Sequence, residues 1–379
     1  MEGVLLPVDT ATAGPLSTLH HNVERASAPH KSSRVVSRRS SPVALILVVL
    51  CLPLGAAPCE WAAGIALATA LFSRTRRHQP LLGPVLAVCF SLLIPSLPYG
   101  SSGVLAVLGK TWPLVLLVAL PPILASLERT DQTLMDVRRI GLLAAAGAAL
   151  WAMGQVISQG QLPWEQAARG PFSHHLTLGY ALLPATAVAI HSRTWLLSVV
   201  LGAGVLASGA SGPMLGLALI IASMWLSPLR CLFAGLGISL LIMSVLIMEP
   251  DLQIRLTHWT AGAQLTLESG LGQGPIDSIR QFQLTESQLS STVRPEQHAH
   301  DSALQWGILG GVGAWLAWIW LLTQLWSLSG EAGRVSIAVL CVGALTQDVF
   351  GDLEVVRALC AWCLLSATPI DTEPISAEA

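Results

Sequence analysis

Long apolar segments separated by short polar turns run along most of the chain. A bilayer core about 30 Å thick needs roughly 20 helical residues to cross it, and about 17 are tolerable, so each such segment is a candidate membrane span. The pattern therefore predicts an all-α integral membrane protein with about 12 transmembrane helices. These segments lie near 42–58, 60–73, 80–97, 103–126, 140–158, 175–191, 195–208, 212–228, 231–248, 302–327, 335–350 and 354–370.

One polar interruption, residues 249–301, is much longer than the others and separates predicted spans 9 and 10. Connections between neighbouring helices are usually short, and long ones are disproportionately functional. This segment is also rich in His, Arg and Gly, residue types that suit binding or chemistry. We therefore expect it to be a catalytic loop.

Composition supports the membrane assignment. Hydrophobic residues make up 53% of the chain and charged residues only 11%, whereas soluble domains are about 25% charged. The net charge of −2 carries little information, because in membrane proteins the side on which Lys and Arg collect is what matters. Nucleic acid is not an expected partner.

The basic residues indicate an orientation. If the first of about 12 spans starts in the cytosol, most basic residues outside the long loop fall in cytosolic connections, as the positive-inside rule requires. These are the tail, Arg74, Arg76, Arg77, Arg129, Arg138, Arg139, Arg193, Arg230 and Arg334. Both termini are then cytosolic, and the loop at 249–301 faces the opposite, extracytoplasmic side.

The predicted organisation has five parts. Residues 1–41 form a disordered, basic cytosolic tail, residues 42–248 form spans 1–9, and residues 249–301 form the outer loop. Residues 302–370 form spans 10–12, and residues 371–379 form a second cytosolic tail.

The energy source for any chemistry at the outer loop is constrained by this topology. ATP and nucleotide sugars are cytosolic, and the sequence has no phosphate-binding G-x-x-x-x-G-K-[ST] motif. The substrate must therefore arrive already activated, as lipid-linked donors do. We expect no cofactor.

Two possible metal or redox sites have weak support. Cys360 and Cys363 form a C-x-x-C, but it lies inside an apolar run, which favours ordinary packing. His298 and His300 could share one face of a strand and bind a metal, yet no third ligand is evident. No metal is therefore predicted.

Ionisable residues within apolar segments leave two interpretations open. Lys110, Asp348, Asp352, Glu354 and Arg357 all lie near predicted span ends. They suit side chains that reach the membrane interface, and they also suit a transport pathway. A secondary transporter or lipid flippase is therefore the alternative from another functional class.

Four stretches expected on the outer side stand out together. They are 169–176 (RGPFSHHL), 208–213 (SGASGP), 255–259 with 270–275 (RLTHW and GLGQGP), and 298–305 with 310–313 (HAHDSALQ and GGVG). In order, spacing and membrane side they resemble the O-antigen ligase and O-antigen polymerase superfamily over about residues 140–370. In that family the corresponding stretches include a Ser-Arg-Gly turn, an Arg-x-x-x-Trp, a Gly-x-Gly and a His-Asn.

The resemblance implies a GT-C-like architecture and a metal-independent glycosyltransferase in the bacterial inner membrane. Such an enzyme transfers a glycan from an undecaprenyl pyrophosphate carrier to a hydroxyl acceptor, a glycan or lipid, at the periplasmic face. Polymerases and ligases of surface polysaccharides such as lipopolysaccharide and exopolysaccharide both belong to it, and a chain-length co-polymerase is a further partner to test. The polymerase is favoured slightly, because Ser211 stands where the family has arginine.

Two residues are the predicted catalytic pair. Displacing a sugar from pyrophosphate requires stabilisation of a leaving group that gains negative charge, which a guanidinium provides, so Arg255 is assigned to the pyrophosphate. An acceptor hydroxyl attacks better when a base takes its proton, and His300 is assigned to activate or position it. The absent arginine at Ser211 also leaves open a structural or scaffolding role for the chain.

Eight further residues are predicted to contact substrate. Arg169, Arg280 and Arg294 are the cations that could replace the missing one at Ser211, and His298 or Asp301 could orient His300. Trp259 suits stacking on a sugar face, and it equally suits anchoring at the membrane interface. The predicted contacts are Arg169, His174, His175, His258, Trp259, Arg280, His298 and Asp301.

Overall fold

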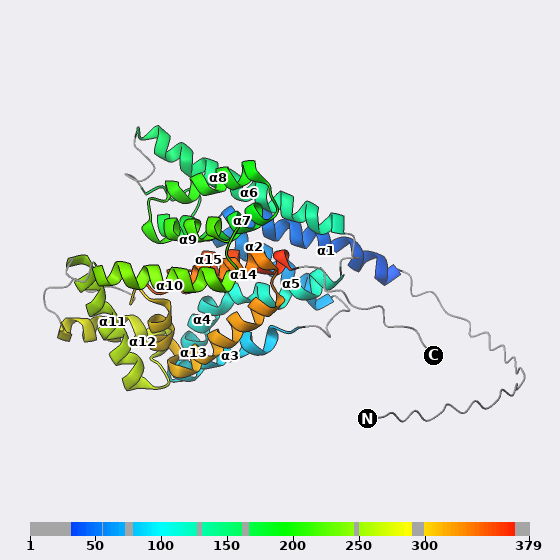
Figure 1. Cartoon of the computed structure of the whole chain (residues 1–379). Helices are drawn as coiled ribbons and strands as arrows, with labels where there is room; N and C mark the ends of the chain where they lie inside the picture. The colour runs from blue at the N-terminus through cyan, green and yellow to red at the C-terminus, as the bar shows by residue number, and fades with distance from the viewer. Residues whose placement is uncertain are drawn as a thin grey trace, which may run out of the picture.

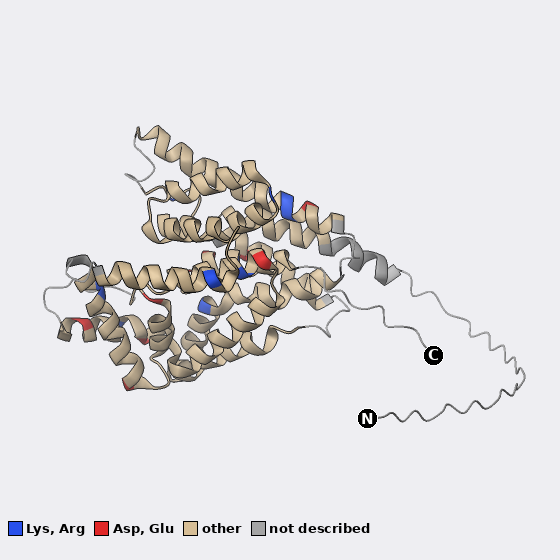
Figure 2. Ribbon diagram, viewed as in Figure 1, with Lys and Arg blue, Asp and Glu red and all other residues tan. Residues whose placement is uncertain are grey.

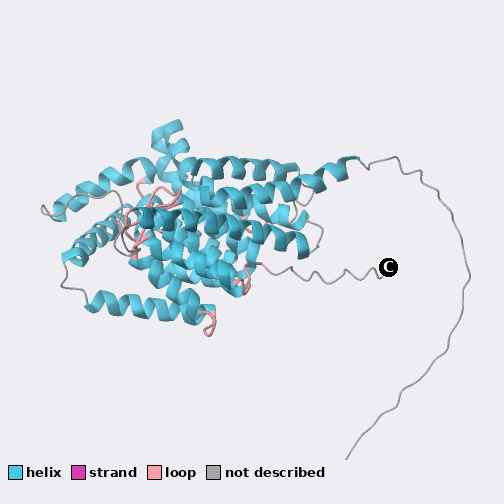
Figure 3. Cartoon of the chain, turned by 90° about the horizontal axis from the view of Figure 1, so that it is seen from above, coloured by secondary structure: helices cyan, strands magenta, loops and turns pink. Residues whose placement is uncertain are grey.

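The chain folds as a bundle of helices, seen in the computed structural model in Figure 1. The structure describes residues 32–54, 56–72, 79–126, 131–160, 167–245, 250–289 and 299–367. Within these ranges there is no strand, as Figure 3 shows from above. The helices are α1 (Ser32–Cys51), α2 (Ala56–Phe72), α3 (Leu82–Ser96), α4 (Gly100–Thr111), α5 (Val115–Ser126), α6 (Asp131–Ser158), α7 (His175–His191), α8 (Trp195–Ala207), α9 (Ser211–Ala222), α10 (Pro228–Val245), α11 (Pro250–Ser269), α12 (Gly274–Leu289), α13 (Ser302–Leu328), α14 (Glu331–Gly343) and α15 (Leu353–Ser366).

Three helical stretches are long and apolar enough to cross a membrane, namely Leu82–Ala125, Gln132–Ser158 and Ser302–Leu328. Five shorter apolar helices accompany them, at Pro42–Leu54, Ala57–Leu71, Trp195–Ala207, Ser211–Ala222 and Pro228–Ser244. The expectation of an all-helical, apolar architecture suited to a membrane is confirmed. The number of spans, about 12, and the sidedness of the loop stay predictions.

Charged side chains are sparse along the bundle, and most lie towards helix ends or in the α11–α12 region (Figure 2). The centre is formed by α7 and α15, whose consecutive residues are buried on every face. All residues from Thr177 to Ile190 and from Val355 to Leu365 are buried. Apart from Arg357, whose Nη2 lies 3.2 Å from Glu60 Oε1, these residues are uncharged, and a helix that is apolar on nearly every side lies inside a bundle rather than at its surface.

Small residues allow the helices to approach closely. A side chain on Gly179 would collide with Pro213 at the start of α9, and one on Gly204 would collide with Ala149 of α6. Small residues at helix contacts are typical of membrane bundles, where van der Waals packing replaces the hydrophobic driving force.

The predicted outer loop folds into two helices, α11 and α12, that dock on α13. Five buried residues from these elements form a small second core, which we call the loop cluster: Ala261, Leu265, Phe282, Ala299 and Ile308. The end of the bundle that carries the loop cluster is called the loop end below.

Helix α13 is interrupted where the loop docks. Gly310 and Gly311 have non-helical backbone angles, and Gly311 lies in the left-handed region at φ 62°. The break frees the Ile308 carbonyl to accept a hydrogen bond from the Gln273 amide at 2.7 Å, while the Val312 amide donates to Gly270 O at 3.3 Å. Neither Gly311 nor Gly272 has room for a side chain, because each backbone packs directly on the other segment.

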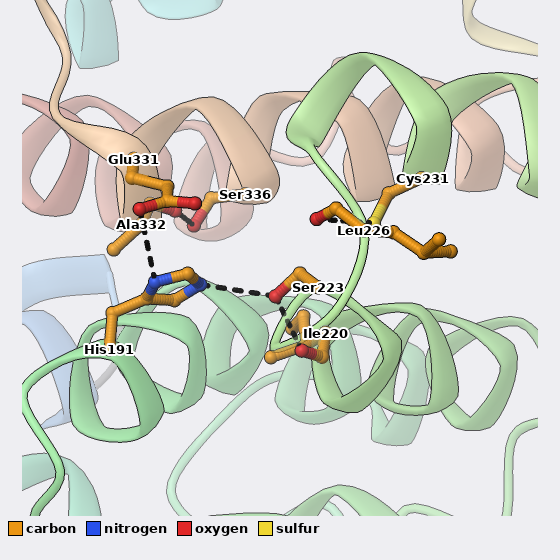
Figure 4. A network of polar contacts seen from close by, with 8 residues as sticks. All are labelled: His191, Ile220, Ser223, Leu226, Cys231, Glu331, Ala332 and Ser336. Atoms are coloured by element: carbon orange, nitrogen blue, oxygen red, sulfur yellow. Dashed lines mark hydrogen bonds and ion pairs between the residues drawn. The ribbon is translucent and has the colours of Figure 1, made fainter.

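At the far end of the bundle, polar residues tie three helices together (Figure 4). His191 ends α7 and lies 3.1 Å from the Ser223 hydroxyl through Nε2 and 3.9 Å from Glu331 Oε2 through Nδ1. Ser223 follows α9, and Glu331 begins α14. This network lies at the opposite end of the 17-residue helix α7 from the loop end, about 25 Å away at 1.5 Å per residue.

Several boundaries differ from the sequence prediction, among them those of α1 and α14. Helix α1 already begins at Ser32, inside the segment assigned to the tail, while residues 1–31 and 368–379 lie outside the described part of the chain. Helix α14 ends at Gly343, so Asp348 and Phe350 lie in a connection rather than in a span. The carbonyl groups left free there find new donors: Ser302 N reaches Ala344 O at 2.9 Å, and Arg255 Nη1 reaches Thr346 O at 2.8 Å.

Candidate functional site

A cavity of about 460 Å³ opens at the loop end of the bundle. Its walls come from α4, the start of α7, α12, the segment before α13, the first part of α13, the connection at 344–352 and the start of α15. Two predicted site residues, His174 and His300, line it. The other polar lining residues are Lys110, Thr177, Tyr180, Ser278, Gln305, Gln347, Asp348 and Asp352.

His300 reaches the cavity from an unusual backbone conformation. Its φ of 52° is in the left-handed region, where a residue other than glycine is uncommon and the backbone strain is about 1–3 kcal/mol. The next residue, Asp301, caps α13 by accepting a hydrogen bond from Leu304 N at 2.8 Å. On the other side, the Gln305 side chain accepts from Ala299 N at 3.1 Å. The bonds on either side of His300 hold it in place.

The carboxylate of Asp301 is thus used by the backbone, rather than being aimed at His300. Burial raises its pKa above the ordinary value, and hydrogen bonds from the Leu304 and Ala303 amides oppose that shift. An asparagine would make a similar cap, so the family's asparagine and this aspartate can serve one structural purpose.

His258 lies directly behind His300. The two ring centroids are 5.3 Å apart with an interplanar angle of 42°. His258 is only 2% exposed, and its Nδ1 is hydrogen-bonded to the Glu286 carboxylate, which is 1% exposed. The structure gives no support to the prediction that His258 contacts substrate, because almost none of its side chain faces solvent.

His174 lines the opposite part of the cavity. It caps α7, because its Nδ1 accepts the Leu176 amide at 3.2 Å, and its ring lies 4.1 Å from that of His175. Since Nδ1 accepts, Nε2 carries the proton of the neutral ring and can donate to a ligand. His175 is half-buried, and its Nδ1 has no hydrogen-bond partner in the described part of the chain.

Arg255 belongs to the same end of the molecule but is not a lining residue. It lies on α11, half-buried, and donates from Nη1 to Thr346 O at 2.8 Å, next to the cavity residues Gln347 and Asp348. A guanidinium has five N–H donors, so this bond leaves others for an anion. Arg255 thus contacts the connection at 344–352, several residues of which line the cavity.

Tyr180 occupies the place next to the turn that lacks the family's arginine. Its hydroxyl is packed against Gly212, the neighbour of Ser211, and its ring against Gly343. The side chain is 2% exposed, and its hydroxyl finds no hydrogen-bond partner among the described residues. Tyr180 also lines the cavity, so a donor group, although not a cation, is present beside Ser211.

Asp348 is the most perturbed acid of the connection. Burial raises the pKa of Asp348 to about 7, and nearby Asp352 adds to the increase, while Lys110 and the Gly351 amide oppose it. Gly351 N donates to its Oδ1 at 3.0 Å. The cavity wall therefore holds a carboxyl that keeps its proton at a higher pH than an exposed aspartate does.

The other predicted residues are dispersed. Arg169 and Arg280 are exposed, and neither lines the cavity. Trp259 is half-buried, and its indole nitrogen has no partner in the part of the chain that the structure describes. His298 and Arg294 lie outside the described residues.

Several lining residues were not among the predicted site residues. The sequence shows Lys110, Asp348 and Asp352 only as ionisable residues near span ends, and it gives no indication that Thr177, Tyr180 and Gln305 face a cavity. The available signal was charge inside apolar segments, which is costly in a membrane protein and often functional. Glu286 gave no signal, because it is one acid in a polar stretch.

No family model matches the sequence, and no curated protein matches it either. The family resemblance therefore stays a prediction, and the support for a function comes from the arrangement of residues around the cavity.

Proposed function

We propose that this chain is a glycosyltransferase of the O-antigen ligase and polymerase type. It would move a glycan from undecaprenyl pyrophosphate to a hydroxyl acceptor at the periplasmic face of a bacterial inner membrane. The observation that carries the proposal is His300, fixed in a left-handed conformation on the wall of a polar cavity at one end of an apolar helical bundle. The chemistry needs a positioned base and a cation near one another, and both are close to this cavity.

In the proposed reaction, the acceptor oxygen attacks the anomeric carbon of the donor sugar. The bond between that carbon and the pyrophosphate oxygen breaks, and the carrier leaves as the pyrophosphate anion. The acceptor proton passes to His300, which holds the hydroxyl in the cavity. Arg255 beside the connection at 344–352 and Lys110 on the wall stabilise the charge that develops on the leaving group.

The proposal favours a polymerase over a ligase. Ser211 departs from the arginine of the ligase pattern, and Tyr180 fills the space beside that turn. Deleting the gene distinguishes the two activities. A polymerase deletion leaves single repeat units on the carrier or core, whereas a ligase deletion accumulates long polymer that stays unattached.

The first test is complementation of that deletion with His300→Ala at normal expression. We expect the variant to reproduce the deletion phenotype, with the lipid-linked glycan accumulating on the periplasmic side. Normal glycan length and yield from both His300→Ala and Arg255→Ala would contradict the proposal and favour a scaffolding role.

One observation favours the alternative of a lipid flippase or transporter. Transporters often contain broken helices near a substrate site, and α13 is broken at Gly310 and Gly311 beside the ionisable cavity residues. In that case the deletion would trap the lipid-linked glycan on the cytosolic side. Accessibility of the glycan to an added glycosidase in spheroplasts separates the two functions.

A further inference from the structure

A buried, hydrogen-bonded pair of ionisable side chains joins the two helices that form the loop cluster. His258 of α11 and Glu286 of α12 are 2% and 1% exposed. The ring of His258 lies 6.4 Å from that of Phe282. Two ionisable groups therefore occupy the interior of a very small core.

Joining two helices does not require such a pair. Removing charges from water is costly, and a buried ion pair is often no more stabilising than well-packed apolar side chains of similar volume. The loop cluster already has apolar residues from both helices and from α13. The pair is therefore better explained by what it does to its neighbours than by the docking of α11 on α12.

The neighbour is His300. Its ring is 5.3 Å from that of His258, and His300 lines the cavity. A carboxylate oxygen only accepts, so the bond to Glu286 requires a proton on His258 Nδ1. This bond also fixes the orientation of the His258 ring relative to His300.

Arg255 depends on the same helix. It precedes His258 by three residues on α11, so the two side chains leave the same face of that helix. The bond between His258 and Glu286 therefore holds the helix that carries Arg255 against α12.

We propose that Glu286 and His258 are positioning residues for His300. Glu286 fixes the ring of His258, and His258 packs behind His300 and holds its imidazole towards the cavity. Neither residue touches substrate. This inference rests on the proposed function, because it gives His300 a reaction to be positioned for.

The test uses the full-length protein, purified in detergent, and the lipid-linked glycan extracted from the strain that carries His300→Ala. For Glu286→Gln we expect kcat to fall on the order of 100-fold while KM for the donor changes little, because geometry and not binding is lost. Glu286→Asp keeps the charge and should recover part of the rate. His258→Gln should resemble Glu286→Gln.

A second variant separates positioning from folding. His258→Leu combined with Glu286→Leu replaces the ion pair by apolar volume, so the loop cluster should stay folded and thermal unfolding should be unchanged or later. We expect its kcat to be as low as that of Glu286→Gln. Glu268→Gln serves as control, because Glu268 lies exposed on α11 and bonds Gln264 at 2.8 Å, and it should keep the parental kcat.

Full kcat in the double leucine variant, or in Glu286→Gln, would overturn the inference, since the pair would then serve docking alone. If Glu286→Gln does not fold, the double variant decides. Failure of the proposed function is recognised separately, because His300→Ala itself would then leave glycan transfer intact.

Discussion

The two ends of α7 carry histidines in contrasting surroundings. At the far end, His191 is enclosed by Ser223 and Glu331, so that polar groups of three helices are bonded to one another (Figure 4). At the loop end, His174 and the start of α7 face a cavity that also receives His300, Lys110 and Asp348. A histidine at one end of α7 thus connects helices, whereas a histidine at the other end is a candidate ligand.

The difference shows what distinguishes a functional polar group in an apolar bundle. Burial alone does not, because both ends contain buried polar residues. What differs is whether the donors and acceptors are used by other parts of the chain or remain directed at open space. The predictions below test this contrast between the loop end and the far end.

The largest expected effect is on glycan transfer by His300→Ala. General acid–base groups contribute on the order of 10²–10⁴-fold, and the variant should lose a factor in that range. The measurement is the transfer rate with extracted lipid-linked donor. His191→Ala at the far end is the matched histidine control, with a rate within about 2-fold of the parent because that residue only ties helices. Equal losses in both variants would remove the distinction between the two ends.

Arg255→Ala should lower the transfer rate next most, by about 100-fold, since one lost donor to a developing anion typically costs that much. The control is Arg334→Ala, because Arg334 also donates to a backbone carbonyl, Trp326 O at 3.1 Å, but at the far end. Both variants lose a bond to the backbone and should unfold at a lower temperature. Only Arg255→Ala should lose activity, and a comparable loss in Arg334→Ala would mean that Arg255 acts through stability alone.

Gly311→Ala should destabilise the docking of the loop on α13. Gly311 has a φ of 62°, at which an alanine is strained by about 1–3 kcal/mol, and the added Cβ would also collide with the Gly270 carbonyl. Limited proteolysis of the α11–α12 segment in purified protein would detect the loosened loop. Gly147→Ala in α6 is the control, because a Cβ there meets nothing within 4 Å and alanine is the better helix former. Equal protease resistance of the two variants would contradict firm docking of the α11–α12 segment on α13.

The smallest effect concerns pH. Because the pKa of Asp348 is raised to about 7 from 3.8, the folded protein keeps a proton that the unfolded chain releases between about pH 4 and pH 7. The stabilisation from this group is therefore complete below about pH 4 and is lost as pH rises to about 7. Asp348→Asn should flatten this decline by a few °C in the unfolding temperature. An unchanged pH profile in the variant would show that the carboxyl is not buried in the native protein.

Local patterns predicted much of this arrangement. Apolar periodicity indicates the helical membrane architecture, and the polar segment at 249–301 marks the loop that contains Arg255 and His300. The sequence marks Gly310 and Gly311 as part of a motif. Their structural role is to break α13 where the turn at 270–273 packs, and this role depends on two segments that are close only in the folded chain.

The other residues of the site could not be predicted from the sequence, for a related reason. Lys110 on α4 and Asp348 after α14 are separated by most of the chain, and only the packing around α7 and α15 brings them to one cavity. Glu286 is a single acid in a polar helix, and its burial depends on the docking of α11, α12 and α13 together. Periodicity within one helix holds no information about such contacts.

The break in α13 also bears on how this protein can be recombined with relatives. Because the Gln273 amide donates to Ile308 O and the Val312 amide donates to Gly270 O, the turn between α11 and α12 and the middle of α13 are best exchanged together. A chimera that exchanges the polar loop but keeps the recipient's helix would lose the interlocking glycines on one side. A domain boundary placed at the start of α13 would therefore separate segments that pack on each other. A boundary at the break in the middle of α13 suits this protein better.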